Sequence, residues 1–163
     1  METNREEKIA LYPGSFDPFH VGHEYIVNMA LDIFDKVVIC IAVNTDKTPF
    51  FTYTQREDII KEIYKNNERV EVVLCDGLVV DKAIEMNAVA IVKGIRDTKD
   101  VSYEMTQADC NMFIGKIPTI FIPGNPAYSF ISSTLVKAII KNAKNKEEIK
   151  NMLKGIVNKK FYE

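Results

Sequence analysis

The chain has two histidines, His20 and His23, and both belong to the segment YPGSFDPFHVGH at residues 12–23. An apolar run precedes this segment and an apolar-periodic stretch follows it, which predicts a strand, a tight turn and the start of a helix. The first N–H groups of a helix lack partners and lie at the positive end of its dipole, so they attract anions. We therefore interpret the segment as an anion site with a hydroxyl at Ser15 and two imidazoles. The alternative is a capped turn without chemistry, but a structural role gives no reason for both histidines to cluster.

Three further segments carry groups that can bind phosphate. The segment KGIR at residues 93–96 places two cations around a glycine, which lets a ligand approach the backbone closely. Residues 128–134, YSFISST, end in three consecutive hydroxyls at a predicted helix start, more than one N-cap needs. Lys47 lies between Asp46 and Thr48, ahead of a proline and two phenylalanines. Taken singly, these segments are also compatible with solvated surface charges, an ordinary cap and an exposed lysine.

Apolar runs and helical patterns alternate along the chain. We expect strands at residues 9–12, 37–43, 70–75, 88–92 and 119–122. We expect helices at residues 22–34, 54–65, 78–86, 101–113, 132–141 and 146–157, the second opened by a capping box from Thr54 to Glu57. This order predicts one Rossmann-like α/β domain over residues 1–163, with a parallel five-stranded sheet and helices on both faces.

The segments that can bind phosphate all follow strand ends. The loops at residues 13–20, 44–53, 76–77, 93–99 and 123–131 begin where the predicted strands finish. Ligands of parallel sheets bind beyond the carboxyl ends of the strands, so we expect these segments to form one polyphosphate site. Neither a Walker A sequence nor GxGxxG is present, which argues against a P-loop or a dinucleotide fingerprint.

Composition excludes several other classes of protein. The 163 residues are 47% hydrophobic and 27% charged, with a formal net charge of −2, which argues against a general nucleic-acid surface. The three cysteines are scattered without a CxxC, which predicts a reducing cytoplasm and no zinc site. The first eight residues are polar and do not resemble a signal peptide, and the longest apolar run, at residues 37–43, is too short to cross a membrane. We therefore expect neither nucleic acid nor membrane as a partner.

The end of the chain carries an apolar stripe of Ile149, Met152, Leu153, Ile156 and Val157. Packing on the domain's own core is the favoured interpretation, and a contact between subunits is the alternative.

Taken together, these motifs resemble the nucleotidyltransferases with an HxGH motif, and among them the bacterial phosphopantetheine adenylyltransferase family. The resemblance runs from about residue 9 to residue 137 and includes YPGSFDP, the Lys47 region, GLVV at residues 77–80, KGIRD, Glu104, Asn111 and YSFISSTLVK. Members of this family make dephospho-coenzyme A and pyrophosphate from ATP and 4′-phosphopantetheine, use Mg²⁺ and assemble as homohexamers. The resemblance implies the same activity, cofactor and assembly here.

The resemblance also implies roles for individual residues. Catalysis is expected from His23, which stabilises the transition state, together with Lys47 and Arg96. Binding of phosphopantetheine is expected from Ser15, Lys47, Val79 and Lys93. The ATP site is expected to comprise Ser15, Phe16, His20, His23, Gly94, Ile95, Arg96, Glu104, Tyr128, Ser129, Phe130, Ile131, Ser132, Ser133 and Thr134. Magnesium is expected on ATP phosphates and water, with no protein ligands.

Two positions depart from the family pattern. Lys93 stands where the family usually has arginine, so the charge is kept but the planar fork is lost. Residues 124–127 lack the acidic residue common in that loop. Three alternative functions remain: a nicotinamide-mononucleotide adenylyltransferase, a cytidylyltransferase of the same superfamily, and a nucleotide- or coenzyme-A-binding sensor without turnover.

Overall fold

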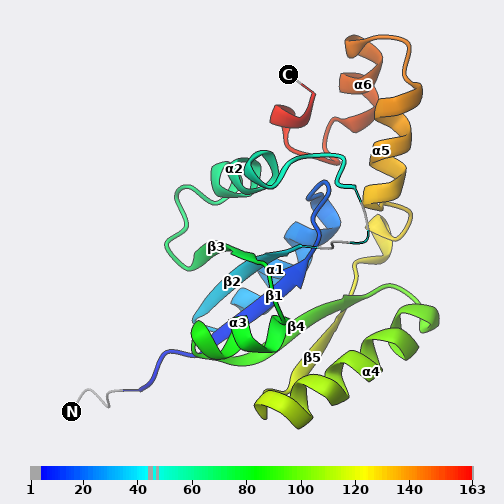
Figure 1. Cartoon of the computed structure of the whole chain (residues 1–163). Helices are drawn as coiled ribbons and strands as arrows, with labels where there is room; N and C mark the ends of the chain where they lie inside the picture. Colours follow the sequence, from blue (N-terminus) through cyan, green and yellow to red (C-terminus); the bar gives the residue numbers. More distant parts are fainter. Residues whose placement is uncertain (1–4, 44–45, 47, 163) are drawn as a thin grey trace.

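A five-stranded parallel sheet with strand order β3-β2-β1-β4-β5 forms the centre of the molecule. The computed structural model describes residues 5–43, 46 and 48–162 (Figure 1). The strands are β1 (Ile9–Gly14), β2 (Lys36–Ala42), β3 (Val70–Cys75), β4 (Ala88–Ile95) and β5 (Thr119–Pro123). The expected Rossmann-like sheet is confirmed.

Helices cover both faces of the sheet. They are α1 (Val21–Leu31), α2 (Tyr53–Ile63), α3 (Val79–Glu85), α4 (Thr98–Gly115), α5 (Ser133–Asn142) and α6 (Lys146–Leu153), with short 3-10 turns at Pro126–Tyr128 and Lys159–Phe161. Side chains of α1 and α2 pack on one face, and side chains of α3 on the other. No helix among the described residues is long and apolar enough to cross a membrane.

Alternation along the central strands fills both cores. In β1, Ala10 and Tyr12 belong to the cluster under α1 and α2, whereas Leu11 belongs to the cluster under α3. In β2, Val38 and Cys40 likewise face away from their neighbours in the chain. Successive side chains of a strand point to opposite faces, so a strand covered on both sides needs an unbroken apolar run.

Several expected boundaries were wrong. The capping box that opens α2 is formed by Thr52 and Gln55, not by Thr54 and Glu57: Thr52 Oγ1 accepts from the Gln55 N–H at 3.2 Å, and Gln55 Oε1 accepts from the Thr52 N–H at 2.9 Å. The pattern occurs twice, two residues apart, and sequence alone does not separate the two registers. The KGIR lysine, glycine and isoleucine lie inside β4, where Gly94 is in register with Ile122 of β5, and α4 begins at Thr98 instead of residue 101.

The C-terminal segment packs on the body of the molecule, at the end away from the N-terminus (Figure 1). Leu153 and Val157 are buried with Ile59 and Phe161 in a third apolar cluster, and the Val21 N–H donates to the Ile156 carbonyl at 2.8 Å. The own-core interpretation of the apolar stripe is therefore confirmed for Leu153 and Val157. Met152 remains half exposed, and α6 ends at Leu153 instead of residue 157.

Candidate active site

A cavity of about 500 Å³ opens at the carboxyl ends of β1 and β4. The chain leaves β1 toward β2 on one side, while β4 lies on its other side, so the strand order reverses at this point. Parallel sheets of this kind bind ligands at such a reversal. Besides strand residues, the cavity is lined by the first turn of α1, by α4 and by the segment that leads into α5.

The two histidines together cap the N-terminus of α1. Nδ1 of His20 accepts from the Gly22 N–H at 3.1 Å, and Nδ1 of His23 accepts from the His20 N–H at 3.1 Å. Their rings stack, with centroids 3.7 Å apart. The expectation that a structural role gives the histidines no reason to cluster was wrong, because this reciprocal cap requires both. The N–H groups of the first turn of α1, which were expected to bind an anion, are occupied within the chain: Gly22 donates to His20 Nδ1 and Val21 to the Ile156 carbonyl.

Both imidazoles are neutral at physiological pH. Burial, reinforced by the Arg96 charge, lowers the pKa of His20 from 6.5 to about 4. Burial also holds the pKa of His23 well below its usual range, with smaller contributions from His20 and Arg96. A neutral ring whose Nδ1 accepts a hydrogen bond carries its proton on Nε2. Each ring therefore keeps one Nε2–H donor, which suits an anionic ligand.

Tight packing fixes the turn between β1 and α1. A Cβ at Gly22 would lie 3.0 Å from Cε1 of His20, so a larger residue would press on the capping ring. A Cβ at Gly14 would lie 2.8 Å from the Phe16 ring, which folds back over this position. Phe16 itself has a φ of 47°, an unusual conformation for a residue with a side chain. These glycines are required by close approach.

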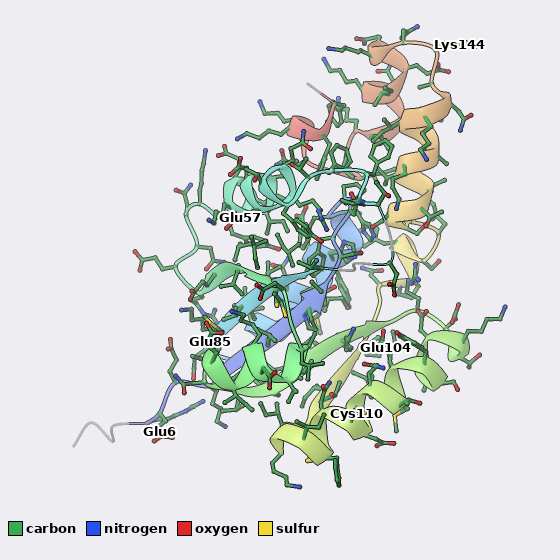
Figure 2. The ribbon with its side chains drawn as sticks, in the orientation of Figure 1. Glu6, Glu57, Glu85, Glu104, Cys110 and Lys144 are labelled. Atoms are coloured by element: carbon green, nitrogen blue, oxygen red, sulfur yellow. The ribbon has the colours of Figure 1, made fainter. Side chains whose placement is uncertain are left out.

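Two cations and two carboxylates face the cavity from β4 and α4. Lys93 Nζ lies 3.2 Å from Glu104 Oε2, which lies between α4 and β4 (Figure 2). Arg96 Nε lies 3.3 Å from Asp100 Oδ2, and the Arg96 N–H donates to the same oxygen at 3.3 Å. The cations are thus held in place and balanced in charge. An incoming phosphate must share or displace these carboxylates.

The hydroxyls before and within the first turn of α5 have structural partners as well. Ser132 Oγ caps the helix by accepting from the Leu135 N–H at 3.1 Å. Ser133 Oγ donates to the Pro18 carbonyl at 2.9 Å and so ties α5 to the turn after β1. Serine oxygens retain acceptor capacity when they donate, and the free N–H groups of the first turn remain available to an anion.

Most of the expected site residues line this one cavity. They are Phe16, His20, His23, Lys93, Gly94, Ile95, Arg96, Glu104, Tyr128, Ser129, Ile131, Ser132, Ser133 and Thr134. Ser15 is exposed beside the cavity, Phe130 is 67% exposed and outside its lining, and Val79 packs with the cluster under α3. Lys47 lies outside the described residues.

The cavity has further lining residues that were not named individually from the sequence, although most lie in the segments expected to form the site: Tyr12, Pro13, Gly14, Gly22, Ile26, Asp100, Gly124, Asn125 and Pro126. Asp100 was not named because the helix was expected to begin at residue 101, whereas α4 begins at Thr98 and so holds Asp100 in its first turn, beside Arg96. The other residues determine the shape of the cavity, and the shape of a cavity cannot be predicted from residue types. In the part of the chain that the structure describes, no group of three or more His, Cys, Asp or Glu side chains could hold a metal ion.

Comparison with known proteins shows the family to which the chain belongs. The family model described as cytidylyltransferase-like matches residues 11–139. A phosphopantetheine adenylyltransferase of Francisella tularensis subsp. novicida (strain U112) is 44% identical over 143 residues, which are 86% of this chain and 88% of the relative. The chain belongs to the phosphopantetheine adenylyltransferase family. It is therefore an adenylyltransferase of the HxGH nucleotidyltransferase superfamily, and the resemblance stated from the motifs is confirmed.

Solved structures share the fold at lower identity. A bifunctional NMN adenylyltransferase/ADP ribose pyrophosphatase from Francisella tularensis has a TM-score of 0.62 and 17% identity, covering 87% of this chain and 44% of that one. A Plasmodium falciparum nicotinic acid mononucleotide adenylyltransferase has a TM-score of 0.57 and 18% identity, covering 90% of each chain. These similarities show the fold and do not show the substrate.

Proposed function

We propose that the protein transfers the adenylyl group of ATP to 4′-phosphopantetheine, giving dephospho-coenzyme A and pyrophosphate. The observation that carries the proposal is the 44% identity to a phosphopantetheine adenylyltransferase along 86% of the chain. The cavity at β1 and β4 supports it, since imidazole donors, two cations and a hydroxyl-rich helix start face one space.

The chemistry of this transfer matches the groups present. The nucleophile is a phosphate monoester, which is already ionised near neutral pH, so no general base is needed. The enzyme has to align nucleophile, α-phosphorus and leaving pyrophosphate, and to neutralise the charge that develops between them. Fixed donors in a partly closed cavity do this well, because they need not reorient during the reaction.

Each group has a distinct part in this mechanism. The Nε2–H of neutral His23 donates to the α-phosphate as negative charge develops. Arg96 holds the ATP phosphates, and Lys93 together with Lys47 holds the phosphate of phosphopantetheine. The first-turn N–H groups of α5 and the hydroxyls beside them bind the remaining phosphate oxygens. Asp100 and Glu104 orient Arg96 and Lys93 until phosphate takes over as their partner.

We further propose that Mg²⁺ arrives with ATP. The cavity's two carboxylates, Asp100 and Glu104, are each engaged by a cation. This donor set fits an ion held by phosphate oxygens and water, because Mg²⁺ keeps several waters and needs few protein ligands. When bound, the ion would supply neutralisation of charge on the transferred and leaving phosphates.

We also propose that the enzyme is a homohexamer. The support lies in α4, an 18-residue helix with no buried residue, on which Tyr103, Met112, Phe113 and Ile114 are exposed. Large exposed apolar patches of this kind mark contacts with other molecules.

We also propose that the enzyme acts in the cytoplasm. Cys40, Cys75 and Cys110 are free cysteines, which supports a reducing compartment.

A substrate panel tests the proposed function. Purified protein is given ATP and Mg²⁺ with 4′-phosphopantetheine, nicotinamide mononucleotide or glycerol phosphate, and CTP replaces ATP in a parallel series. We expect pyrophosphate and dephospho-coenzyme A from ATP with phosphopantetheine only. Faster turnover with another acceptor or with CTP would overturn the proposal, and binding without any turnover would identify a sensor.

A further inference from the structure

Three polar or charged side chains are buried in the described part of the chain: Asp17, His20 and Arg56. His20 caps α1, as described above. Asp17 belongs to the turn between β1 and α1, and Arg56 reaches this turn from α2, although the two residues lie 39 positions apart in the sequence. Burying a charge is costly unless it makes specific contacts, so the contacts of these two residues indicate what they hold in place.

Arg56 reaches the turn from the first part of α2. Its side chain is 2% exposed, and Nη1 donates to the Ser15 carbonyl at 2.6 Å. Nε lies 3.5 Å from the Thr52 carbonyl, and the guanidinium lies over the Tyr53 ring at 4.2 Å. Nη2 is buried without a hydrogen-bond partner. An unpaired buried donor lowers stability, which indicates that Arg56 has a role beyond stabilising α2.

The Ser15 carbonyl is connected to the His23 imidazole through the next residue, Phe16. Phe16, the next residue, has the left-handed φ of 47° and is 2% exposed. Its ring meets the His23 ring edge-on, with centroids 5.0 Å apart, and meets Phe19 at 5.3 Å. A shift of the Ser15–Phe16 peptide therefore moves the surface against which the His23 imidazole rests.

Asp17 holds the other side of the same turn. Its two carboxylate oxygens accept from the Phe50 and Phe51 N–H groups, each at 2.8 Å. Phe51 in turn packs on Phe161 of the C-terminal segment. The turn is thus fixed to the segment that opens α2 at two points, one through a buried cation and one through a buried anion.

We propose that Arg56 is a positioning residue for adenylyl transfer, which it serves by holding the Ser15 carbonyl and, through Phe16, the His23 imidazole. The inference rests on the proposed function for its kinetic consequence, but its structural part concerns the histidine alone. Arg56 is not among the residues that line the cavity, so its loss acts on the alignment of His23. Misplacement of a catalytic group by about 1 Å can cost about a hundredfold in rate.

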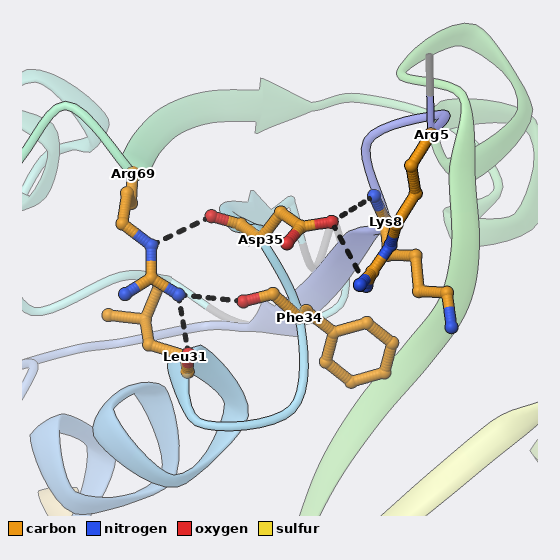
Figure 3. Close-up of polar contacts among 6 residues, drawn as sticks. All are labelled: Arg5, Lys8, Leu31, Phe34, Asp35 and Arg69. Atoms are coloured by element: carbon orange, nitrogen blue, oxygen red, sulfur yellow. Dashed lines mark hydrogen bonds and ion pairs between the residues drawn. The ribbon is translucent and has the colours of Figure 1, made fainter. Parts of the chain in front are cut away.

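The test uses Arg56→Lys, Arg56→Met and the matched control Arg69→Met. Arg69 grips the other end of α1, where its guanidinium donates to the carbonyls of Leu31, Phe34 and Asp35 (Figure 3). Both arginines therefore stabilise the chain around the same helix, but only Arg56 lies at its histidine end. Lysine keeps the charge and loses the fork that spans two carbonyls, so Arg56→Lys should fall between wild type and Arg56→Met.

Two measurements are made on the folded variants. Steady-state kinetics should show kcat reduced about a hundredfold in Arg56→Met and less in Arg56→Lys, with smaller changes in both KM values. Because the chain has two histidines, their imidazole NMR signals can be followed individually. The His23 signals should move in both Arg56 variants and stay in place in Arg69→Met, whose kcat should equal that of wild type.

Each outcome decides the inference. A folded Arg56 variant with wild-type kcat and unmoved His23 signals would overturn it, and so would an equal loss of kcat in Arg69→Met, which would show a merely structural effect. If Arg56→Met does not fold, Arg56→Lys carries the same comparison. Absence of wild-type turnover with phosphopantetheine would sink the proposed function instead, while the histidine signals would still test the positioning.

Discussion

At the scale of single residues, the HxGH motif combines structure and chemistry in the same two rings. Sequence reasoning located both histidines and their place at a helix start. It offered a capped turn only as the alternative and did not assign the cap to the histidines, because histidine is not among the usual N-cap residues. With each Nδ1 engaged by a backbone N–H, the proton stays on Nε2. The cap thus determines which hydrogen-bond donor the substrate meets.

The lowered pKa of His20 predicts a specific pH dependence of stability. Above pH 6.5 the ring is neutral in both the folded and unfolded states, and its contribution is complete. Between pH 6.5 and about 4 only the unfolded state takes up the proton, so the free energy of unfolding falls as pH falls. The slope is about 1.4 kcal/mol per pH unit for this group.

His20→Asn isolates this contribution, because asparagine caps helices and does not titrate. Urea unfolding at several pH values should show wild type losing stability relative to His20→Asn between pH 6.5 and about 4. Parallel curves for the two proteins would contradict the buried neutral state of His20.

Loss of the Lys47 charge should change KM for phosphopantetheine only. Lys47 lies outside the described residues, so this prediction rests on the sequence and on the family. Removing a charge that holds the phosphopantetheine phosphate before and during transfer should raise KM for that substrate and leave KM for ATP unchanged. Initial rates of Lys47→Ala, with Lys61→Ala on α2 as a matched loss of charge, provide the measurement. A KM defect for ATP instead would reassign the residue.

At the scale of elements, local sequence patterns predicted the helices and strands whose formation depends on neighbouring residues in the chain. The strands of the central sheet were found because burial on both faces demands continuous apolar runs. The extent of β4 was underestimated, since Lys93 is polar and Gly94 is flexible, and residues 93–95 continue the strand by pairing with β5. The cap of α2 was misplaced because two overlapping patterns compete. Contacts such as Arg56 with Ser15 join distant segments and leave no local pattern.

The junction between the turn after β1 and the start of α2 gives a prediction at this scale. In Asp17→Asn one acceptor oxygen is lost, and an amide N–H₂ group faces a backbone N–H. Leaving a buried donor unpaired should reduce the free energy of unfolding by about 1–3 kcal/mol. Asp35→Asn is the matched control, because Asp35 also accepts from a backbone N–H, that of Lys8 at 2.8 Å, but on the surface (Figure 3).

Urea unfolding of both variants measures the difference. Asp17→Asn should have the lower free energy of unfolding of the two variants. An equal loss in Asp35→Asn would show that burial of the Asp17 hydrogen bonds does not increase their contribution to stability.

At the scale of the whole molecule, the C-terminal segment is packed on the rest of the chain, whereas helix α4 is exposed. The C-terminal segment packs at the N-terminal end of α1, where the Ile156 carbonyl accepts from the Val21 N–H. On the opposite side α4 lies at the edge of the molecule without a buried residue (Figure 1). The sequence indicated the C-terminal stripe as a possible subunit contact, but that stripe is largely occupied within the chain. The exposure of α4 was not predicted, because large apolar side chains such as Tyr103 and Phe113 on a helix usually indicate packing on the core.

The surface of α4 therefore carries the prediction on assembly. Wild type should be a hexamer by light scattering at micromolar concentration. Phe113 is 80% exposed, and Phe113→Glu should shift the mass toward smaller species, because a charge would be buried in the contact. Ile33→Glu, which changes another exposed apolar residue away from α4, should keep the wild-type mass. A wild-type monomer would remove the proposal of a hexamer.

We propose that the cavity catalyses direct transfer of the adenylyl group from ATP to phosphopantetheine, and that the His23 imidazole stabilises the transition state of this transfer. The most direct test of this proposal is the rate of pyrophosphate release from ATP and 4′-phosphopantetheine in wild type, His23→Ala and His23→Gln, with ATP affinity measured by calorimetry. Glutamine can close a capping box at this position, so His23→Gln separates the imidazole donor from the cap. Both variants should bind ATP nearly normally and lose roughly a hundredfold or more in kcat. A folded His23 variant with wild-type kcat would contradict the account.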